Sequence, residues 1–257
     1  MGVDDLGLNA IPGGTITMRD ARSGGTREVR LNAFSIGTTA VRSADFVSLS
    51  DASIVYESAG EPARPMTWFA AVQWCNAASA ADDIEAAYTI DDRSVQWDTG
   101  SNGFRLPTEA EWEFACRAGT TTPTYGPLDA IAWTAADGVD GPQEVGLKRP
   151  NDFGLYDTLG NVWEWCWDYA DTARYGDYRA LRGGGWADQA WSCRASVRRG
   201  SAPDAVLEDV GFRVAQGAVG ERGAREAQGW SADADRQRAD IRGPLPVGWT
   251  PLRSLLG

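Results

Sequence analysis

The stretch Gly154-Leu-Tyr-Asp-Thr-Leu-Gly-Asn-Val-Trp-Glu-Trp-Cys-Trp-Asp168 decides how this chain folds. It holds three tryptophans, two glycines and three carboxylates in fifteen residues, a density that neither a plain helix nor a plain strand explains. On a strand, Trp163, Trp165 and Trp167 share one face because successive side chains point to opposite sides. We predict a rigid loop that leads into a strand whose indoles fill the core.

The composition predicts one loop-rich domain followed by a tail. The 257 residues are 43% hydrophobic and include 30 Gly, 12 Pro and 12 Trp, so the chain can bury a sizeable core while much of its backbone forms turns. Beyond Gly217 the sequence becomes highly charged and poor in bulky apolar residues. We therefore expect a domain over residues 1–217 and a charged C-terminal tail over 218–257, which is either a solvated helix or disordered.

Charge and residue usage exclude several classes of function. The net charge is -12 and Lys148 is the single lysine, which argues against nucleic acid because such affinity rests on cationic side chains. We expect no membrane span and a cytoplasmic location, since no apolar run is long enough and the N-terminus lacks the order of a secretory signal. Histidine is absent, which removes Ser-His-Asp triads, His-paired cysteine nucleophiles and histidine-ligated iron.

Local patterns place the regular elements. Alternating residues predict short strands or a hairpin over 11–18 and 26–36, and a further strand over 94–97. Apolar residues spaced by three predict an amphipathic helix that begins after Thr67. A second helix begins at the capping box of Thr108 and Glu111 and stops at Gly119. Its three glutamates, at positions 109, 111 and 113, are explained by their place near the positive end of the helix. Residues 120–152 form a long structured loop.

Two carboxylates within the opening stretch could hold a metal ion. Asp157 and Glu164 bracket the glycine turn at Gly160, which could direct carbonyl oxygens inward, and oxygen ligands of this kind suit calcium. The alternative is structural: Asp157 caps a turn, and Glu164 is a strand residue bonded to an arginine. The spacing alone leaves both interpretations open.

Four cysteines, at positions 75, 116, 166 and 193, fit neither a zinc arrangement nor a disulfide scaffold. Cys193 precedes Arg194, a setting that could lower the pKa of a thiol and make it nucleophilic. No general base lies near it in the sequence, so inert packing is the favoured interpretation of the cysteines.

Five collinear motifs carry a resemblance to a known family. They lie at residues 11–15, 103–119, 154–165, 181–186 and 210–213 and span about residues 10–216. In this order they resemble the formylglycine-generating enzyme, or sulfatase-modifying factor, family. The resemblance implies an α+β, irregular and loop-rich C-type-lectin-like fold with two main helices and short antiparallel strands.

The resemblance also implies metal sites. The calcium site of the family falls on the side chains of Asp157 and Glu164 and on the carbonyls of Gly160 and Val162, so we expect structural Ca²⁺ there. A second calcium site would use Asp137, the Val139 carbonyl and residues 131–132, but Ile131 stands where the family has asparagine.

At the positions of the family's catalytic centre, this sequence departs more strongly from the family pattern. Formylglycine-generating enzymes bind copper(I) through two cysteines that a serine precedes, and these positions are Asp188, Cys193 and Gly185 here. Because soft thiolates suit copper(I) and a carboxylate does not, we expect no copper. Asp188 and Cys193 remain the candidate pocket residues.

Residues 183–213 further resemble the variable proteins of diversity-generating retroelements, which have the same fold. In that branch the corresponding positions form an exposed ligand-binding surface. Those positions are Trp186, Ala187, Asp188, Gln189, Trp191, Ser192, Val197, Arg199, Gly200, Ser201, Ala202, Ala205, Leu207 and Glu208.

Three functions stay open at this point. The favoured hypothesis is a non-catalytic binding domain for an unknown protein or small-molecule ligand, with a binding surface that a retroelement could diversify. The chain is alternatively an enzyme of the same superfamily that matures a protein or peptide oxidatively with an atypical active site. A third hypothesis is an accessory subunit whose tail binds a partner.

Overall fold

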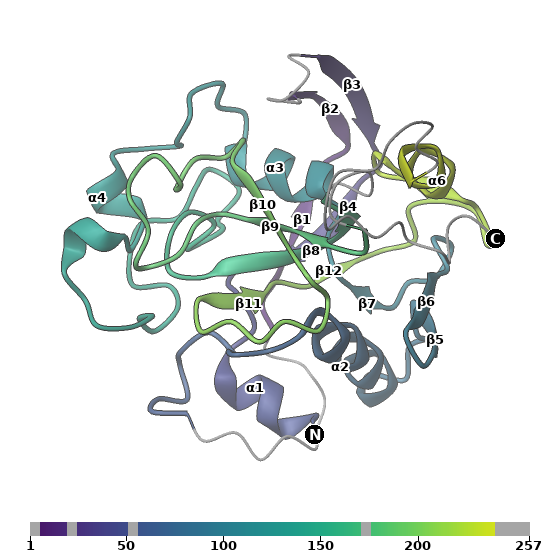
Figure 1. Ribbon diagram of the computed structural model, residues 1–257, viewed down its shortest axis with the longest axis horizontal. Helices are drawn as coiled ribbons and strands as arrows, with labels where there is room; N and C mark the ends of the chain where they lie inside the picture. Colours follow the sequence, from purple (N-terminus) through teal and green to yellow (C-terminus); the bar gives the residue numbers. More distant parts are fainter. Residues whose placement is uncertain (1–5, 20–24, 51–55, 171–175, 240–257) are drawn as a thin grey trace.

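The computed structural model describes residues 6–19, 25–50, 56–170 and 176–239 and contains two four-stranded sheets (Figure 1). The first sheet has the order β1-β4-β12-β7, and all its pairs are antiparallel. Its strands are β1 (Leu8–Ile11), β4 (Phe34–Gly37), β12 (Ala215–Gln216) and β7 (Phe104–Arg105). Segments from both ends of the predicted domain therefore lie side by side.

The second sheet is built around the opening stretch. Its order is β10-β9-β8-β11, from β10 (Arg198–Ser201), β9 (Arg179–Arg182), β8 (Trp163–Tyr169) and β11 (Val210–Phe212). Two of its pairs are antiparallel, as predicted, whereas β11 runs parallel to β8. The parallel pair brings the Gly-Phe-Arg motif beside the tryptophan strand.

Three hairpins flank these sheets. The predicted one forms from β2 (Gly14–Arg19) and β3 (Thr26–Leu31), and a second pairs β5 (Tyr88–Asp91) with β6 (Ser94–Trp97), the strand predicted over 94–97. A third, not predicted, pairs β13 (Glu226–Ala227) with β14 (Trp230–Ser231). Residue alternation predicted the first hairpin and one strand of the second, whereas the third lies in the region expected to be a charged tail.

Two helices dominate the described helical structure, as predicted. Helix α2 (Trp68–Ala81) begins at Thr67, whose hydroxyl accepts from the Ala70 amide, and α3 (Glu109–Arg117) begins with the predicted capping box. The left-handed residue that ends α3 is Ala118 (φ 43°), one position before the predicted Gly119. Shorter elements are α1 (Ser43–Ser48), α4 (Leu128–Ile131), the 3₁₀ turn η1 (Ala135–Asp137) and α6 (Ala232–Ala239). Residues 120–152 are otherwise irregular.

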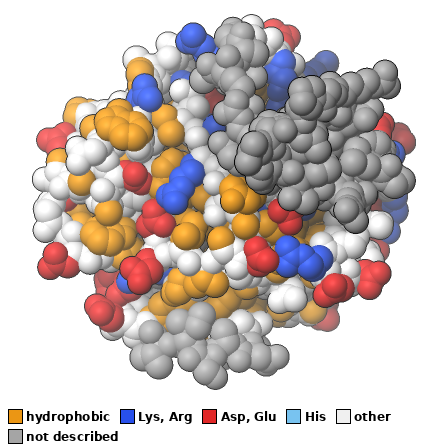
Figure 2. Space-filling view, viewed as in Figure 1, with side chains coloured by type: hydrophobic (Ala, Val, Ile, Leu, Met, Phe, Trp, Pro, Cys, Tyr) orange, Lys and Arg blue, Asp and Glu red, His pale blue; other side chains and the backbone are white. Residues whose placement is uncertain are grey.

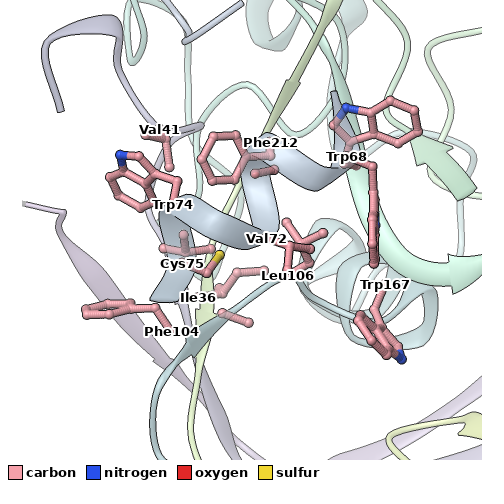
Figure 3. Close-up of a cluster of buried hydrophobic side chains, with 14 of the residues drawn as sticks. Ile36, Val41, Trp68, Val72, Trp74, Cys75, Phe104, Leu106, Trp167 and Phe212 are labelled. Atoms are coloured by element: carbon pink, nitrogen blue, oxygen red, sulfur yellow. The ribbon is translucent and has the colours of Figure 1, made fainter. Parts of the chain in front are cut away.

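Strand β8 is buried on both faces, between α2 and α3 (Figure 1). Its three tryptophans lie in the main hydrophobic cluster with Trp68 and Val72 of α2 (Figure 3), whereas Cys166 packs with Trp112 of α3 in a second cluster. The prediction that the indoles share a core-facing side is confirmed. Glu164 lies on the opposite face, where burial of its charge requires a partner.

The first part of the expected tail packs against the domain. Val219 and Gln228 are buried, and the Gln228 side chain donates to the Asn32 carbonyl (3.1 Å) and to Glu111 (2.8 Å) while accepting from the Asn32 amide (2.8 Å). The Gln228 carbonyl accepts from the Thr108 hydroxyl at 2.8 Å. Residues 218–235 are therefore continuous with the domain, and positions 240–257 of the predicted tail lie outside the described residues.

We expect Gln228→Ala to lower the free energy of unfolding by about 2–3 kcal/mol, because it removes the hydrogen bonds that the buried Gln228 side chain makes with the Asn32 backbone and with Glu111. Urea unfolding followed by tryptophan fluorescence measures this loss. The matched control is Gln189→Ala, at an exposed position, which should change stability by less than about 0.5 kcal/mol. Equal effects of the two variants would contradict a structural role for Gln228.

Candidate functional site

The glycine turn of the opening stretch is fixed by close backbone packing. Gly160 has φ 74°, and a Cβ there would lie 2.2 Å from the Trp133 carbonyl oxygen, so no other residue fits without a shift of the backbone. The next residue, Asn161, brackets Gln143 by accepting from its amide (2.8 Å) and donating to its carbonyl (3.0 Å). These contacts anchor the loop of residues 120–152 to the turn, as the sequence predicted for a rigid loop.

Glu164 forms a buried ion pair with Arg213, the arginine of the Gly-Phe-Arg motif. The shortest contact joins Arg213 Nη2 to Glu164 Oε1 at 2.8 Å, and Trp112 Nε1 donates to Glu164 Oε2 at 2.7 Å. Arg213 also donates to the carbonyls of Gly37 and Tyr156, each at 2.7 Å. The structural interpretation of Glu164, a strand carboxylate bonded to an arginine, is confirmed.

Asp157 retains one oxygen without a partner. Its Oδ2 accepts from the Gly146 amide at 2.7 Å, whereas Oδ1 is buried with no hydrogen bond in the described structure. Burial raises the pKa of this carboxyl above its ordinary value, and the Gly146 hydrogen bond opposes that rise. Asp157 therefore has an oxygen to offer a cation.

The expected calcium donors do not fit the ion as they are placed. Calcium takes six to eight oxygens, whereas both oxygens of Glu164 are occupied by Trp112 and Arg213, leaving Asp157 Oδ1 as the free side-chain donor beside the carbonyls of Gly160 and Val162. A dication would also face the Arg213 guanidinium. Calcium at this place stays a prediction of the family resemblance.

Lys148 lies where the second calcium site was considered. Its ammonium donates to Asp137 Oδ1 (2.6 Å) and to the carbonyls of Ala132 (2.5 Å) and Asp129 (3.0 Å), and it lies over the Trp133 ring. Asp137 Oδ2 also caps the 3₁₀ turn through Thr134. Two of the expected ligands, Asp137 and the Ala132 carbonyl, thus already bind a cationic side chain.

We expect EDTA to leave the melting temperature unchanged, because Arg213 already pairs with Glu164 and Lys148 already pairs with Asp137. Arg213→Met should lower the free energy of unfolding by about 3–5 kcal/mol, because it leaves the buried carboxylate of Glu164 without its cationic partner. The control Arg222→Met removes an exposed pair with Glu85 and should cost less than about 1 kcal/mol.

Differential scanning fluorimetry with and without EDTA and added CaCl₂ measures the effect of calcium. A fall of the melting temperature on chelation, reversed by calcium, would instead assign a bound ion, because a ligand that binds only the native state adds stability by mass action.

Asp188, at the position of a family catalytic cysteine, braces a turn. Its Oδ2 accepts from Trp163 Nε1 (2.6 Å) and from the Gly185 amide (2.8 Å), and its carbonyl accepts from the Ala135 amide (2.9 Å). A carboxylate engaged by two donors is held in place. The structure brings Asp188 close to Cys193, as the sequence-based pairing of these positions required.

Cys193 is an unreactive thiol in this setting. Its side chain is buried, and burial, with the nearby charge of Asp188, raises its pKa to about 12. The thiolate, which is the nucleophile and the metal ligand, is therefore scarce at neutral pH. All four cysteines are free and buried, consistent with the predicted inert packing.

The glutamates of α3 form an ion network, which corrects the explanation from helix position alone. Glu109 pairs with Arg182 (2.8 Å) and Arg198, Glu113 pairs with Arg182 (3.0 Å) and Arg117 (2.8 Å), and Glu111 pairs with Arg105 (2.6 Å). The two neighbouring arginines hold the pKa of Glu109 near 2 against the effect of burial. Arg182 and Arg198 are distant in sequence from these glutamates, so local reasoning missed them.

The segment from Trp186 to Glu208 presents a row of exposed side chains, which we call the recognition face. Ala187, Gln189, Trp191, Arg199 and Glu208 are exposed, and Trp191 is 66% exposed despite its size. Eight predicted positions are half-buried: Trp186, Asp188, Val197, Gly200, Ser201, Ala202, Ala205 and Leu207. In Figure 2 the visible face of the molecule mixes hydrophobic, acidic and basic side chains without separating them.

Two positions of this segment differ from the prediction. Ser192 is 4% exposed, because its amide donates back to the Gln189 carbonyl in a tight turn, so it is not part of the face. Val206, which the sequence did not single out, is 62% exposed.

Among the described residues, no helix is both long and apolar enough to cross a membrane.

The fold and these motifs define an α+β domain of the irregular, C-type-lectin-like class. Residues 7–218 match the model of the sulfatase-modifying factor enzyme 1-like domain, and the chain belongs to this family. The likeness covers the predicted domain and stops close to its predicted end at residue 217.

Relatives of this chain include both enzymes and a protein described as inactive. A formylglycine-generating enzyme of Streptomyces coelicolor is 29% identical over 81% of this chain and 88% of its own. An inactive C-alpha-formylglycine-generating enzyme 2 of Bos taurus is 40% identical over 45% of each chain. Among solved structures, Treponema denticola variable protein 1 superposes with a TM-score of 0.72 at 27% identity, covering 81% of this chain and 94% of that one.

Proposed function

We propose that this protein is a non-catalytic binding domain that recognises its ligand through the recognition face. The observation that carries the proposal is Trp191, a large aromatic side chain held 66% exposed among exposed residues of mixed charge. Tryptophan and arginine side chains are among the groups that contribute most to binding energy in protein interfaces. The similarity to a variable protein of Treponema denticola supports the same assignment.

The state of the family's catalytic positions supports the absence of catalysis. Asp188 accepts two hydrogen bonds and braces the turn, while the thiol of Cys193 is buried with a raised pKa. Neither side chain is placed or ionised to bind copper(I) as a thiolate pair. The similarity to an inactive relative is consistent with this interpretation.

We expect no oxidation of a cysteine-containing peptide by the purified protein supplied with copper(I) and oxygen. Mass spectrometry of the peptide detects an aldehyde product directly. Asp188→Cys should also remain inactive, because Gly185 still stands at the serine position of the family and the new thiol replaces the brace to Trp163. Turnover by the unaltered protein would favour the alternative of an enzyme with an atypical site.

Recognition is tested by panning the purified protein against a random-peptide phage library and a glycan array. Ligands selected by the unaltered protein should lose at least about tenfold in affinity on Trp191→Ala, equivalent to about 1.4 kcal/mol. The matched control is Leu147→Ala, which removes a side chain 61% exposed outside the face. Ligands whose affinity is unchanged by Trp191→Ala but falls with Leu147→Ala would contradict the proposed face.

Diversification of the face by a retroelement makes a separate genetic prediction. A neighbouring gene should encode a reverse transcriptase, with a near-copy of the segment that encodes residues 183–213 beside it. Its absence would remove diversification and leave a binding domain of fixed sequence.

A further inference from the structure

A cavity lies beside β9, with Arg179 in its wall and with Pro203, a buried residue of the segment 186–208, also in its lining. Its volume is about 530 Å³, within the range of small-molecule sites. We call it the Arg179 pocket. Aromatic rings make up much of its lining, which includes Phe69, Trp97, Trp167, Tyr169 and Trp230.

Arg179 is a buried cation stacked between aromatic rings. It is 6% exposed, and its guanidinium carbon lies 3.8 Å from the ring centre of Trp68 and 3.7 Å from that of Tyr169. Its Nη1 donates to the Trp167 carbonyl at 2.7 Å, whereas its Nε is buried without an acceptor. Figure 3 shows Trp68 and Trp167 together at one end of the hydrophobic cluster.

Arg179 lacks the carboxylate that other buried arginines have. Arg105 pairs with Glu111, Arg182 with Glu109, and Arg213 with Glu164, whereas no carboxylate among the described residues lies within 4.0 Å of Arg179. Two acids do line the pocket, but Asp177 pairs with Arg93 and Asp235 accepts from Trp230 Nε1. Because an uncompensated buried charge is costly, the cavity beside Arg179 favours an anion.

Further donors in the same wall also lack acceptors. The indole N–H groups of Trp97 and Trp167, both lining residues, have no hydrogen-bond partner in the described structure. Buried polar groups are normally satisfied, so these unmatched donors add to the positive potential of the wall beside Arg179. A carboxylate supplies the negative charge that Arg179 lacks.

One wall of the pocket comes from outside the family domain. The family match ends at residue 218, and six of the lining residues follow it. They are Gly223, Ala224, Arg225, Trp230, Ala232 and Asp235. Trp230 lies 5.5 Å from Trp97 and 5.6 Å from Trp167, measured between ring centres. The segment after the domain thus completes an aromatic enclosure that the domain alone leaves open on this side.

We propose that the Arg179 pocket binds a small organic monocarboxylate with an apolar, ring-sized body. The carboxylate pairs with the buried Arg179 guanidinium, and the body packs against Phe69, Trp97 and Trp230. A single negative charge fits best, because three arginines (Arg93, Arg179 and Arg225) and two aspartates (Asp177 and Asp235) line the pocket.

Isothermal titration calorimetry of the full chain with benzoate, phenylacetate and cyclohexanecarboxylate tests this site. We expect at least one of these probes to bind at a ratio of one to one, and at least tenfold more tightly than benzyl alcohol or benzylamine of similar size. The neutral and cationic probes separate recognition of the carboxylate from burial of an apolar ring.

Two variants locate the binding. Arg179→Gln should weaken carboxylate binding at least tenfold, and Ala224→Trp should abolish binding by filling the pocket from a half-buried position in its lining. Arg222→Gln, an exposed position outside the lining, is the matched control and should bind as the unaltered protein does. If Arg179→Gln fails to fold, Ala224→Trp and the probe series decide alone.

Three results would overturn the proposal: no binding of any carboxylate at millimolar concentration, equal affinity for benzylamine, or undiminished binding by Ala224→Trp. Loss of binding here leaves the recognition face untouched, because Trp191 is not part of this pocket.

Discussion

The ion pair between Glu164 and Arg213 is the interaction on which the rest of the fold depends. It joins the centre of β8 to the Gly-Phe-Arg motif, and the same guanidinium holds the carbonyls of Gly37 and Tyr156. One buried side chain thus connects the end of β4, the glycine turn and the tryptophan strand. Because the pair lies out of water, removing either member leaves the other uncompensated, so the two residues must be retained together.

Local signals predicted the elements, and distant contacts explain what those signals missed. The capping box at Thr108, the Thr67 cap and the strand over 94–97 are written in neighbouring residues and are confirmed. The partners of Glu109 and Gln228 lie far along the chain, and no periodicity encodes them. Residues 218–231 contain few apolar groups, so their composition resembles that of a solvated tail. The few side chains that do pack, such as Trp230 and Gln228, each contact residues from other parts of the chain, and this packing leaves no periodic pattern in the sequence.

The sequence predicted where the residues of the candidate site lie but not what each of them does. Motif spacing placed Asp188 and Cys193 together, and the structure agrees. That Asp188 accepts from Trp163 and Gly185 depends on how the turn folds back over β8, which the sequence does not show. The hydrogen bonds that Trp163 and Gly185 donate to this carboxylate hold the turn in place, so Asp188 has a structural role in the scaffold.

The same packing limits which positions of the recognition face can vary. A Cβ at Gly200 would lie 2.5 Å from the Ala170 Cβ, and one at Gly184 would lie 2.6 Å from Cys193 Sγ. Any larger residue at either position would therefore require the surrounding atoms to move. Ser192 is buried beside them. Ala187, Gln189, Trp191 and Val206 instead project from a backbone that the buried core holds fixed. Because that backbone is already ordered, the proposed binding would cost little backbone entropy, and the exposed side chains could differ in chemistry without refolding of the scaffold.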